Sequence, residues 1–458
     1  MIPLTLNEIA HTVNGRVLNA TGEELVIAPA FIDTRKTIPG GIFIALMGEH
    51  LDGHQFAVDA IQGGAVAALL TRDMGVPSVQ ASEPASALQL LATHVRSSLP
   101  KLKVVGITGS QGKTTTKDLL LAVLSSEAPT IAPPGNLNNE LGVPLTLLRC
   151  SESTRYCILE MGARHPGDIA KLANLAQVDI GAVLNIGSAH VGEFGSDLAL
   201  ARAKGELIAA LKPDGTAILG TYDLATRDLA RNAPCRVVTF GETGEANLRA
   251  ERVSLVHGRP SFHLAGGSEF AEVHLKYYGR HQVANALAVA AIATELGIGL
   301  SRIASALSSA IPTSRWRMEV RQRNGVTVIN DAYNANPESM AAAIELLAEW
   351  AEGDGRPSWA VLGQMHELGA SSDVAHQLIG RLVAQRGVKH LLVVGSGAGE
   401  ILNGARGMAI ADAEMVADSE SALRYLRDRI EPEALILVKA SRAEGLENLA
   451  LEMLGDQA

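Results

Sequence analysis

Residues 108–115 read Thr-Gly-Ser-Gln-Gly-Lys-Thr-Thr, between an apolar run at 103–107 and a helical pattern at 114–124. The glycines allow backbone N–H groups to curl around phosphate oxygens, and the N-terminus of the following helix adds partial positive charge. Lys113 can reach the β- and γ-phosphates of a nucleotide, and the hydroxyl of Thr114 can bind Mg²⁺. This stretch therefore predicts a strand, a phosphate-binding loop and a helix.

The loop departs from the general P-loop spacing at one position. That spacing places a glycine five residues before Gly112, where this chain has Ile107. The alternative interpretation is a glycine-rich turn with an incidental lysine, and the matching strand and helix on either side disfavour it. A P-loop by itself indicates only a protein that uses a nucleoside triphosphate.

Apolar runs on both sides of the loop predict the fold class. Runs of the type found in buried strands alternate with helical stretches, which is typical of a parallel sheet covered on both faces. In the middle of the chain these runs lie at 156–159, 181–184 and 237–240. A second series follows Pro312, at 326–329, 359–362, 391–394 and 435–438. The first part of the chain mixes turn signals with two short strand-like runs, at 42–46 and 66–70. We therefore expect an α/β protein with three domains, at 1–82, 83–312 and 313–458.

The composition excludes several classes of protein. Of the 458 residues, 47% are hydrophobic and 19% are charged, so large cores can form and wholesale disorder is excluded. The 39 Lys and Arg residues against 49 Asp and Glu give a net charge of −10 without basic runs, which argues against nucleic acid or an anionic membrane surface as a partner. No membrane span and no leader pattern is predicted, so a cytoplasmic protein is expected. The three cysteines lack metal-ligand spacing and are expected to be free thiols.

Three further residues are candidates for chemistry near the loop. Glu160 closes the run at 156–159, and ligands gather at the carboxyl ends of parallel strands, although a solvated strand-end carboxylate is the alternative. His190 follows the run at 181–184, but a lone histidine is more often structural. Lys204 lies within a helical pattern, where a lysine is usually solvated. By pattern alone, Glu160 is the one of the three that is favoured as functional.

The loop at 108–115 resembles that of the Mur ligases, the ATP-dependent amide-forming enzymes of peptidoglycan precursor synthesis. Other segments resemble the family in the same order along nearly the whole chain, namely 136–144, 159–163, 189–190, 203–206, 278–286, 317–319 and 330–337. The resemblance implies a small α/β N-terminal domain, a central P-loop ATPase domain with a parallel sheet, and a Rossmann-like α/β C-terminal domain.

The resemblance also implies a set of site residues. The residues that would bind ATP are Gly109, Ser110, Gln111, Gly112, Lys113, Thr114 and Thr115, with Asn285 at the adenine and with Arg317 and Asp331 from the third domain. One Mg²⁺ would be held by Thr114 and Glu160. A second Mg²⁺ would be held by His190 and by Lys204 carrying CO₂ as a carbamate. The catalytic residues would be Lys113, Glu160, His190 and Lys204. The residues that would contact the precursor substrate are Asp33, Thr34, Arg35, Asn138, Asn139, Tyr333, Asn334 and Asn336.

Two segments, 331–340 and 362–369, resemble the branch of the family that adds D-Ala-D-Ala. The resemblance implies that ATP phosphorylates the C-terminal carboxylate of UDP-N-acetylmuramoyl-tripeptide and that the amine of D-Ala-D-Ala attacks the acyl phosphate. A carbamate forms on a neutral amine, so the pocket would have to lower the pKa of Lys204. The site would be complete only when the third domain closes over it. A monomer is expected, with small-molecule substrates and no obligate protein partner.

The chain departs from the usual family pattern at a few positions. Thr34 stands where Ser is common, Arg164 and His165 where Asn-His is more usual, Gln364 and His366 where Asp and Gly are commoner, and Ala440 where Gly is usual. The alternatives are another Mur-type ligase, such as the diamino-acid-adding one whose Asp-Asn-Pro-Arg signature is missing here, a folate-polyglutamate ligase, or a P-loop kinase or ATPase. The last would not require a carboxylate and an amine together.

Overall fold

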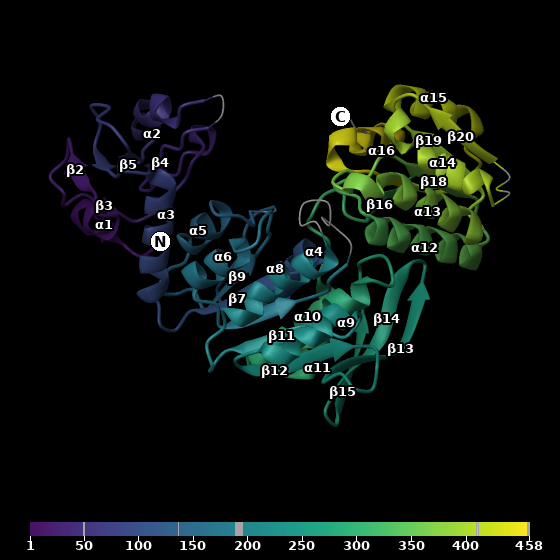
Figure 1. Cartoon of the computed structure of the whole chain (residues 1–458), viewed down its shortest axis with the longest axis horizontal. Coiled ribbons are helices and arrows are strands. Elements are labelled where there is room, and N and C mark those ends of the chain that lie inside the picture. The colour runs from purple at the N-terminus through teal and green to yellow at the C-terminus, as the bar shows by residue number, and fades with distance from the viewer. Residues whose placement is uncertain (49–50, 136, 188–195, 409, 411, 456–458) are drawn as a thin grey trace.

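The computed structural model describes residues 1–48, 51–135, 137–187, 196–408, 410 and 412–455. It is built of three blocks in chain order, with the N-terminal and C-terminal blocks on either side of the central one (Figure 1). The two- and four-stranded sheets belong to the first block, the nine-stranded sheet to the second and the six-stranded sheet to the third. The expected limits at 82 and 312 fall outside the helices and strands and stay predictions.

The N-terminal block contains a four-stranded sheet in the order β2-β6-β5-β4 and a short antiparallel pair, β1 and β3. Its strands are β1 Leu4–Thr5, β2 Arg16–Leu18, β3 Leu25–Val26, β4 Ile42–Ile44, β5 Ala67–Leu70 and β6 Ser78–Gln80. Its helices are α1 Leu6–Thr12 and α2 Ala57–Gln62, with 3₁₀ turns at Thr34–Lys36 and Gly53–Phe56. β4 and β5 are the two strands that the sequence predicts there, and both are fully buried.

The central block is a parallel sheet with helices on both faces, as the apolar runs predict. The parallel strands are β7 Lys103–Thr108, β8 Thr130–Ile131, β9 Tyr156–Glu160, β10 Ile180–Val183, β11 Thr216–Gly220 and β12 Arg236–Gly241. Alternate residues of β7 belong to different cores: Val104 packs with helices on one face and Val105 with helices on the other. This alternation explains why the strands are apolar throughout.

The helices of the central block divide between the two faces of the sheet. The helices on the Val104 face are α3 Pro84–Ser97, α5 Gly142–Leu147, α6 Asp168–Ala176 and α8 Asp197–Ala209. The helices on the Val105 face are α4 Lys113–Ser125, α10 Gln282–Glu295 and α11 Leu300–Ser309. The short elements α9 Leu224–Asp228 and a 3₁₀ turn at Leu229–Asn232 follow β11. The hydrophobic core around α3 is continuous with that of the first block, so the first and central blocks share one hydrophobic core.

An antiparallel extension of the central sheet was not predicted. β13 Leu248–Val256 pairs in parallel with β12 and then antiparallel with β14 Arg259–Gly266, which pairs antiparallel with β15 Glu269–His274. These strands alternate buried and exposed residues, because one of their faces meets solvent. A search for continuous apolar runs therefore misses them.

The C-terminal block is a second α/β unit with strand order β16-β17-β21-β18-β19-β20. Its strands are β16 Glu319–Arg323, β17 Val326–Asn330, β18 Ser358–Leu362, β19 His390–Val394, β20 Asp412–Val416 and β21 Leu435–Lys439. All pairs are parallel except β16 with β17. Its helices are α12 Pro337–Asp354, α13 Ser372–Gln385, α14 Gly399–Arg406, α15 Ser419–Arg429 and α16 Leu446–Leu454, with 3₁₀ turns at Gly369–Ser371, Ser396–Ala398 and Arg442–Glu444. The four predicted strands correspond to β17, β18, β19 and β21.

The C-terminal block is docked onto the β13–β14 hairpin through α12. The rings of Tyr278 and Trp350 stack with centroids 5.2 Å apart, and His257 pairs with Asp354 at 3.0 Å. Gly258 has φ +72° at the tip of the hairpin, where an added Cβ would come 2.8 Å from the Trp350 ring. A glycine there supplies both the left-handed backbone and the close approach.

Two expectations from composition can be compared with the structure. The three cysteines are free thiols, with Cys150 and Cys157 buried and Cys235 half-buried, as expected. Among the helices that the structure describes, none combines the length and the apolar character that crossing a bilayer would require.

Candidate active site

The phosphate-binding loop leaves the sheet between two neighbouring strands. β7 pairs in parallel with β9 and with β10, and Ile107 lies opposite Glu160 in this register. The carboxyl ends of the three strands therefore share one edge of the sheet, where ligands bind in open α/β folds. Gly112 is the N-cap of α4 with φ +79°, and an added Cβ would come 2.3 Å from Oδ1 of Asn285. Glycine is required at this turn for both reasons.

Ser110 and Gln111 anchor the loop to the segment that follows β10. The backbone N–H of Gly187 donates to Oγ of Ser110 at 2.9 Å, and the N–H of Gln111 donates to Oδ1 of Asn185 at 3.0 Å. Asn185 was not among the predicted site residues, although it follows directly on a predicted strand. Thr115 is half-buried in the first turn of α4. The predicted ligand His190 lies outside the described residues.

Glu160 is buried and is hydrogen-bonded to Thr114 and Asn138. Its carboxylate is 2% exposed and accepts a hydrogen bond from Oγ1 of Thr114 at 2.9 Å and one from Nδ2 of Asn138 at 3.0 Å. Mg²⁺ prefers oxygen ligands, and the carboxylate of Glu160 and the hydroxyl of Thr114 supply them here. The donor set therefore fits the predicted metal. In the described part of the chain no cluster of three or more His, Cys, Asp or Glu residues forms, so a bound Mg²⁺ would draw its remaining ligands from phosphate and water.

Two lysines meet on the carbonyl oxygen of Gly109. Nζ of Lys113 donates to it at 2.6 Å, and Nζ of Lys204, from α8, donates at 3.3 Å. Lys204 is 5% exposed, and burial together with the charge of Lys113 lowers its pKa to about 7. A lysine in a helical pattern is expected to be solvated, so this placement is a tertiary effect. The neutral amine that a carbamate requires is therefore well populated at neutral pH.

The surroundings of Lys113 also lower its own pKa. Burial is the larger cause that lowers the pKa of Lys113, and the neighbouring guanidinium of Arg317 lowers it further, while Glu160 opposes both. Arg317 comes from the third block, and its charge acts on Lys113 in the phosphate-binding loop. Its guanidinium lies over the ring of Tyr333 at 3.9 Å. Arg317, Tyr333 and Thr114 line one cavity of about 430 Å³ between the central and C-terminal blocks.

Asn285 lies against the loop from the side of α10. Its Nδ2 donates to Oε1 of Gln282 at 2.8 Å, and its Oδ1 accepts from Oγ1 of Thr116 at 3.3 Å. The bond from Thr116 joins α4 to α10, and the bond to Gln282, within α10, orients the Asn285 amide. The predicted contact of Asn285 with adenine stays a prediction.

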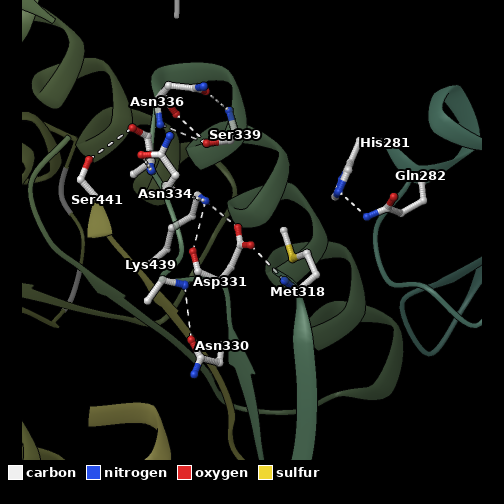
Figure 2. A network of polar contacts seen from close by, with 12 residues as sticks. His281, Gln282, Met318, Asn330, Asp331, Asn334, Asn336, Ser339, Lys439 and Ser441 are labelled. Carbon is white, nitrogen blue, oxygen red and sulfur yellow. Dashed lines mark hydrogen bonds and ion pairs between the residues drawn. The ribbon is translucent and has the colours of Figure 1, made fainter. Parts of the chain in front are cut away.

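Asp331 takes part in a polar network at the start of the third block (Figure 2). Its Oδ2 pairs with Nζ of Lys439 at 2.5 Å, and its Oδ1 accepts from the backbone N–H of Met318 at 2.9 Å. Lys439 also donates to the carbonyl oxygen of Asn334 at 2.8 Å. Figure 2 shows His281 and Gln282, from the central block, to the right of this network. Burial lowers the pKa of His281 to about 4, with the charge of Asp331 opposing, so the ring is neutral at pH 7.

The remaining predicted substrate residues occupy separate places. Asn139 is exposed and its Oδ1 accepts from the backbone N–H of Gly142, at the start of α5. Asp33, Thr34 and Arg35 lie between β3 and β4 in the N-terminal block, apart from β7 and α4 (Figure 1). The guanidinium of Arg35 pairs with Asp33 at 2.9 Å, and its side chain is 88% exposed. The first block thus offers an exposed cation well away from the loop.

Asn336 has a clear structural role as the N-cap of α12. Its Oδ1 accepts from the backbone N–H of Ser339 at 2.8 Å, and Pro337 occupies the first turn. We expect Asn336→Ala to lower the free energy of unfolding by about 1 kcal/mol, and Asn336→Asp, which keeps the cap, to change it little. Chemical denaturation of the two variants measures this. Equal stability of both variants and the parent chain would contradict the capping role.

Comparison with known proteins agrees with this geometry. Residues 107–293 match the family model of the Mur ligase middle domain, and residues 316–442 match that of the Mur ligase glutamate ligase domain. A UDP-N-acetylmuramoyl-tripeptide–D-alanyl-D-alanine ligase of Mycobacterium tuberculosis is 42% identical, with 100% of this chain and 98% of that protein covered. A crystal structure of MurF from Acinetobacter baumannii superposes with a TM-score of 0.90 at 32% identity, covering 99% of each chain. MurF of Thermotoga maritima in complex with ADP superposes with a TM-score of 0.81 at 28% identity, covering 93% of this chain and 97% of that one. The chain belongs to the Mur ligase family.

Proposed function

We propose that this chain is an ATP-dependent ligase that joins D-alanyl-D-alanine to the C-terminal carboxylate of UDP-N-acetylmuramoyl-tripeptide in peptidoglycan precursor synthesis. The observation that carries the proposal is the convergence of Lys113, Thr114 and Glu160 at one sheet edge, with the buried amine of Lys204 on the same loop carbonyl. The similarity to ligases of this name over the whole chain supports the choice of substrates.

The reaction balances as two transfers. A carboxylate oxygen of the tripeptide takes the γ-phosphoryl group of ATP, and ADP and an acyl phosphate form. The neutral amine of D-Ala-D-Ala, formed when its ammonium group loses a proton to solvent, then attacks the acyl carbon. Phosphate leaves with the bonding electron pair, and the attacking nitrogen releases a second proton to phosphate or solvent as the amide forms. The main obstacle is the approach of two anions, so positioned positive charge supplies most of the catalysis.

The residues divide this work between them. Lys113 places a cation at the loop, where the β- and γ-phosphates would lie, and Arg317 adds a second cation from the third block. Thr114 and Glu160 would hold Mg²⁺, which when bound offsets phosphate charge, and Asn138 orients the Glu160 carboxylate. Lys204 would carry CO₂ as a carbamate and, with His190, hold a second Mg²⁺; the lowered pKa of Lys204 supports this assignment. The Asp33–Arg35 segment would contact the UDP end of the precursor, and Tyr333, Asn334 and Asp331 would meet ligands from the third block.

The setting of the reaction follows from its substrates. ATP and UDP-linked precursors are soluble metabolites, so we place the enzyme in the cytoplasm.

The Mg²⁺ assignment to Glu160 can be tested by an isosteric change. We expect Glu160→Gln to raise the Mg²⁺ concentration for half-maximal turnover by about tenfold or more, because the amide keeps the shape but loses the charge that attracts the cation. A Mg²⁺ titration of the steady-state rate measures this. The exposed Glu140→Gln, in the same region of the chain, is the control, and identical Mg²⁺ curves for both variants would contradict the assignment.

The proposed activity is tested by substrate omission. Purified protein is given ATP and Mg²⁺ with UDP-N-acetylmuramoyl-tripeptide and D-Ala-D-Ala together, and then with each omitted. We expect phosphate release that needs both substrates, with one pentapeptide formed per phosphate. Release with neither substrate present, unchanged when they are added, would overturn the ligase and favour an ATPase.

A further inference from the structure

α4, the helix after the phosphate-binding loop, carries a buried pair of charged residues one turn beyond Lys113 and Thr114. Lys117 and Asp118 of α4 are 3% and 9% exposed and form an ion pair at 2.9 Å. Charged side chains are rarely buried so completely unless they are paired with an opposite charge or with hydrogen-bond partners. Together with Thr114 and Leu121 they line the cavity between the central and C-terminal blocks, at the spacing of one helix face.

Lys117 connects this helix to the loop that carries Asn138. Its Nζ donates to the carbonyl oxygen of Pro133 at 3.2 Å and to that of Gly135 at 3.1 Å, in addition to Oδ1 of Asp118. All three donors of the ammonium group are therefore used. Asn138 follows three residues after Gly135 and donates to Glu160. The far side of the loop is fixed because the carbonyl oxygen of Asn138 accepts from the N–H of Gly162, after β9.

Asp118 connects the same helix to the segment between the second and third blocks. Its Oδ2 accepts a hydrogen bond from Oγ of Ser314 at 2.5 Å. Ser314 lies between α11 and β16, three residues before Arg317. Arg317 stacks on Tyr333 and acts electrostatically on Lys113. The hydrogen bond therefore fixes the segment that delivers a cation of the third block to the phosphate-binding loop.

We propose that Lys117 and Asp118 are positioning residues for the phosphate-binding loop. They align with it the loop that carries Asn138, the partner of Glu160, and the segment that carries Ser314 and Arg317. The proposal rests on the proposed function, in which Glu160 holds Mg²⁺ and Arg317 meets the nucleotide. Lys117 acts through Pro133 and Gly135 on Asn138, which donates to Glu160. Asp118 acts through Ser314 on Arg317. Because the two side chains are paired with each other, the two segments are held to one point on α4.

The proposal has two parts, the Lys117 arm (the contacts of Lys117 with Pro133 and Gly135) and the Asp118 arm (the contact of Asp118 with Ser314), and it predicts a different defect for each. Lys117→Met keeps the length of the side chain but removes its three hydrogen bonds, so we expect Mn²⁺ binding to the ADP-loaded protein to weaken about tenfold or more. ADP binding without metal should change less than about twofold, since the loop at 109–112 is untouched. Ser314→Ala removes one hydroxyl, so we expect KM for ATP to rise about three- to tenfold with an unchanged Mg²⁺ requirement. Lys171→Met, an exposed lysine on α6, is the matched control.

The experiment measures Mn²⁺ binding by electron paramagnetic resonance, metal-free ADP binding by calorimetry, and KM and kcat for each substrate. Weakened Mn²⁺ binding with intact ADP binding in Lys117→Met, and the KM effect in Ser314→Ala, are the expected results. Mn²⁺ binding within twofold of the parent in Lys117→Met, or equal loss of metal and metal-free ADP binding, would overturn the Lys117 arm. An unchanged KM for ATP in Ser314→Ala would overturn the other arm, and this mild change keeps the test informative if Lys117→Met unfolds. A parent protein that binds Mn²⁺·ADP but forms no pentapeptide would contradict the proposed function alone.

Discussion

Replacing Lys113 by Met is expected to lower the rate of ATP-dependent pentapeptide formation by about 10²- to 10³-fold, the usual cost of removing one preorganised charge-stabilising donor. Nζ of Lys113 lies 2.6 Å from the Gly109 carbonyl oxygen, at the mouth of the loop, and Glu160 supports its charged form against burial and Arg317. Methionine keeps the volume of the side chain and removes the charge. The effect should fall on kcat, since the charge matters most when the γ-phosphoryl group is transferred.

The control for this change is Lys103→Met. Lys103 begins β7, five residues before the loop, and its side chain is half exposed with a weak 4.0 Å contact to Asp179. We expect its removal to leave kcat within about twofold. Steady-state phosphate release compares the two variants. A Lys113→Met enzyme that keeps more than a third of the parent rate would contradict the assigned role.

Replacing Lys204 by Met is expected to have an effect of similar size, at least about 10²-fold, and to abolish CO₂ binding at this position. Burial and the nearby charge of Lys113 lower the pKa of Lys204 to about 7. The neutral amine is the form that reacts with CO₂, so the carbamate population should rise as the pH increases from 6 to 8. It should fall at acid pH, where the amine takes up a proton.

Labelled CO₂ separates the carbamate from a lysine that is merely buried. With ¹³CO₂ we expect one carbamate carbon resonance per protein chain at pH 8, absent in Lys204→Met and weaker at pH 6. Lys113→Met removes a repelling charge, so the pKa of Lys204 should rise and the midpoint of the carbamate signal should move to higher pH. No carbamate resonance at pH 8, or full activity of Lys204→Met, would contradict the proposed role of Lys204.

Much of the fold follows from the sequence because its strands are buried on both faces. β7, β9 and β10 are continuous apolar runs. The loop between β7 and α4 has a sequence motif that by itself indicates binding of nucleotide phosphates. The β13–β15 extension could not be found in this way, since its strands are half exposed. The cap at Asn336 has a local signal that could have identified it, an Asn followed by Pro and, two residues later, Ser.

The parts of the site that sequence reasoning missed depend on contacts between distant residues. Lys439 pairs with Asp331 across 108 positions, and no local pattern connects them. Lys117 and Asp118 fit the pattern of a solvated helix surface, and they are buried because the 133–135 segment and Ser314 cover them. The unusual environment of Lys204 likewise arises from its packing against the Gly109 carbonyl and Lys113. The sequence pattern shows which residue types are present. Their burial in the folded chain decides which of them have altered charge states or hydrogen-bond partners.

The most direct test of amide formation through an acyl phosphate follows the oxygen atoms of the tripeptide. UDP-N-acetylmuramoyl-tripeptide labelled with ¹⁸O in its C-terminal carboxylate is converted with ATP and D-Ala-D-Ala, and the released phosphate is analysed by mass spectrometry. We predict one ¹⁸O atom in each phosphate and one in the new amide, because a carboxylate oxygen leaves with the phosphoryl group. Unlabelled phosphate, formed at the same rate as pentapeptide or without it, would contradict transfer of the γ-phosphoryl group to the substrate carboxylate.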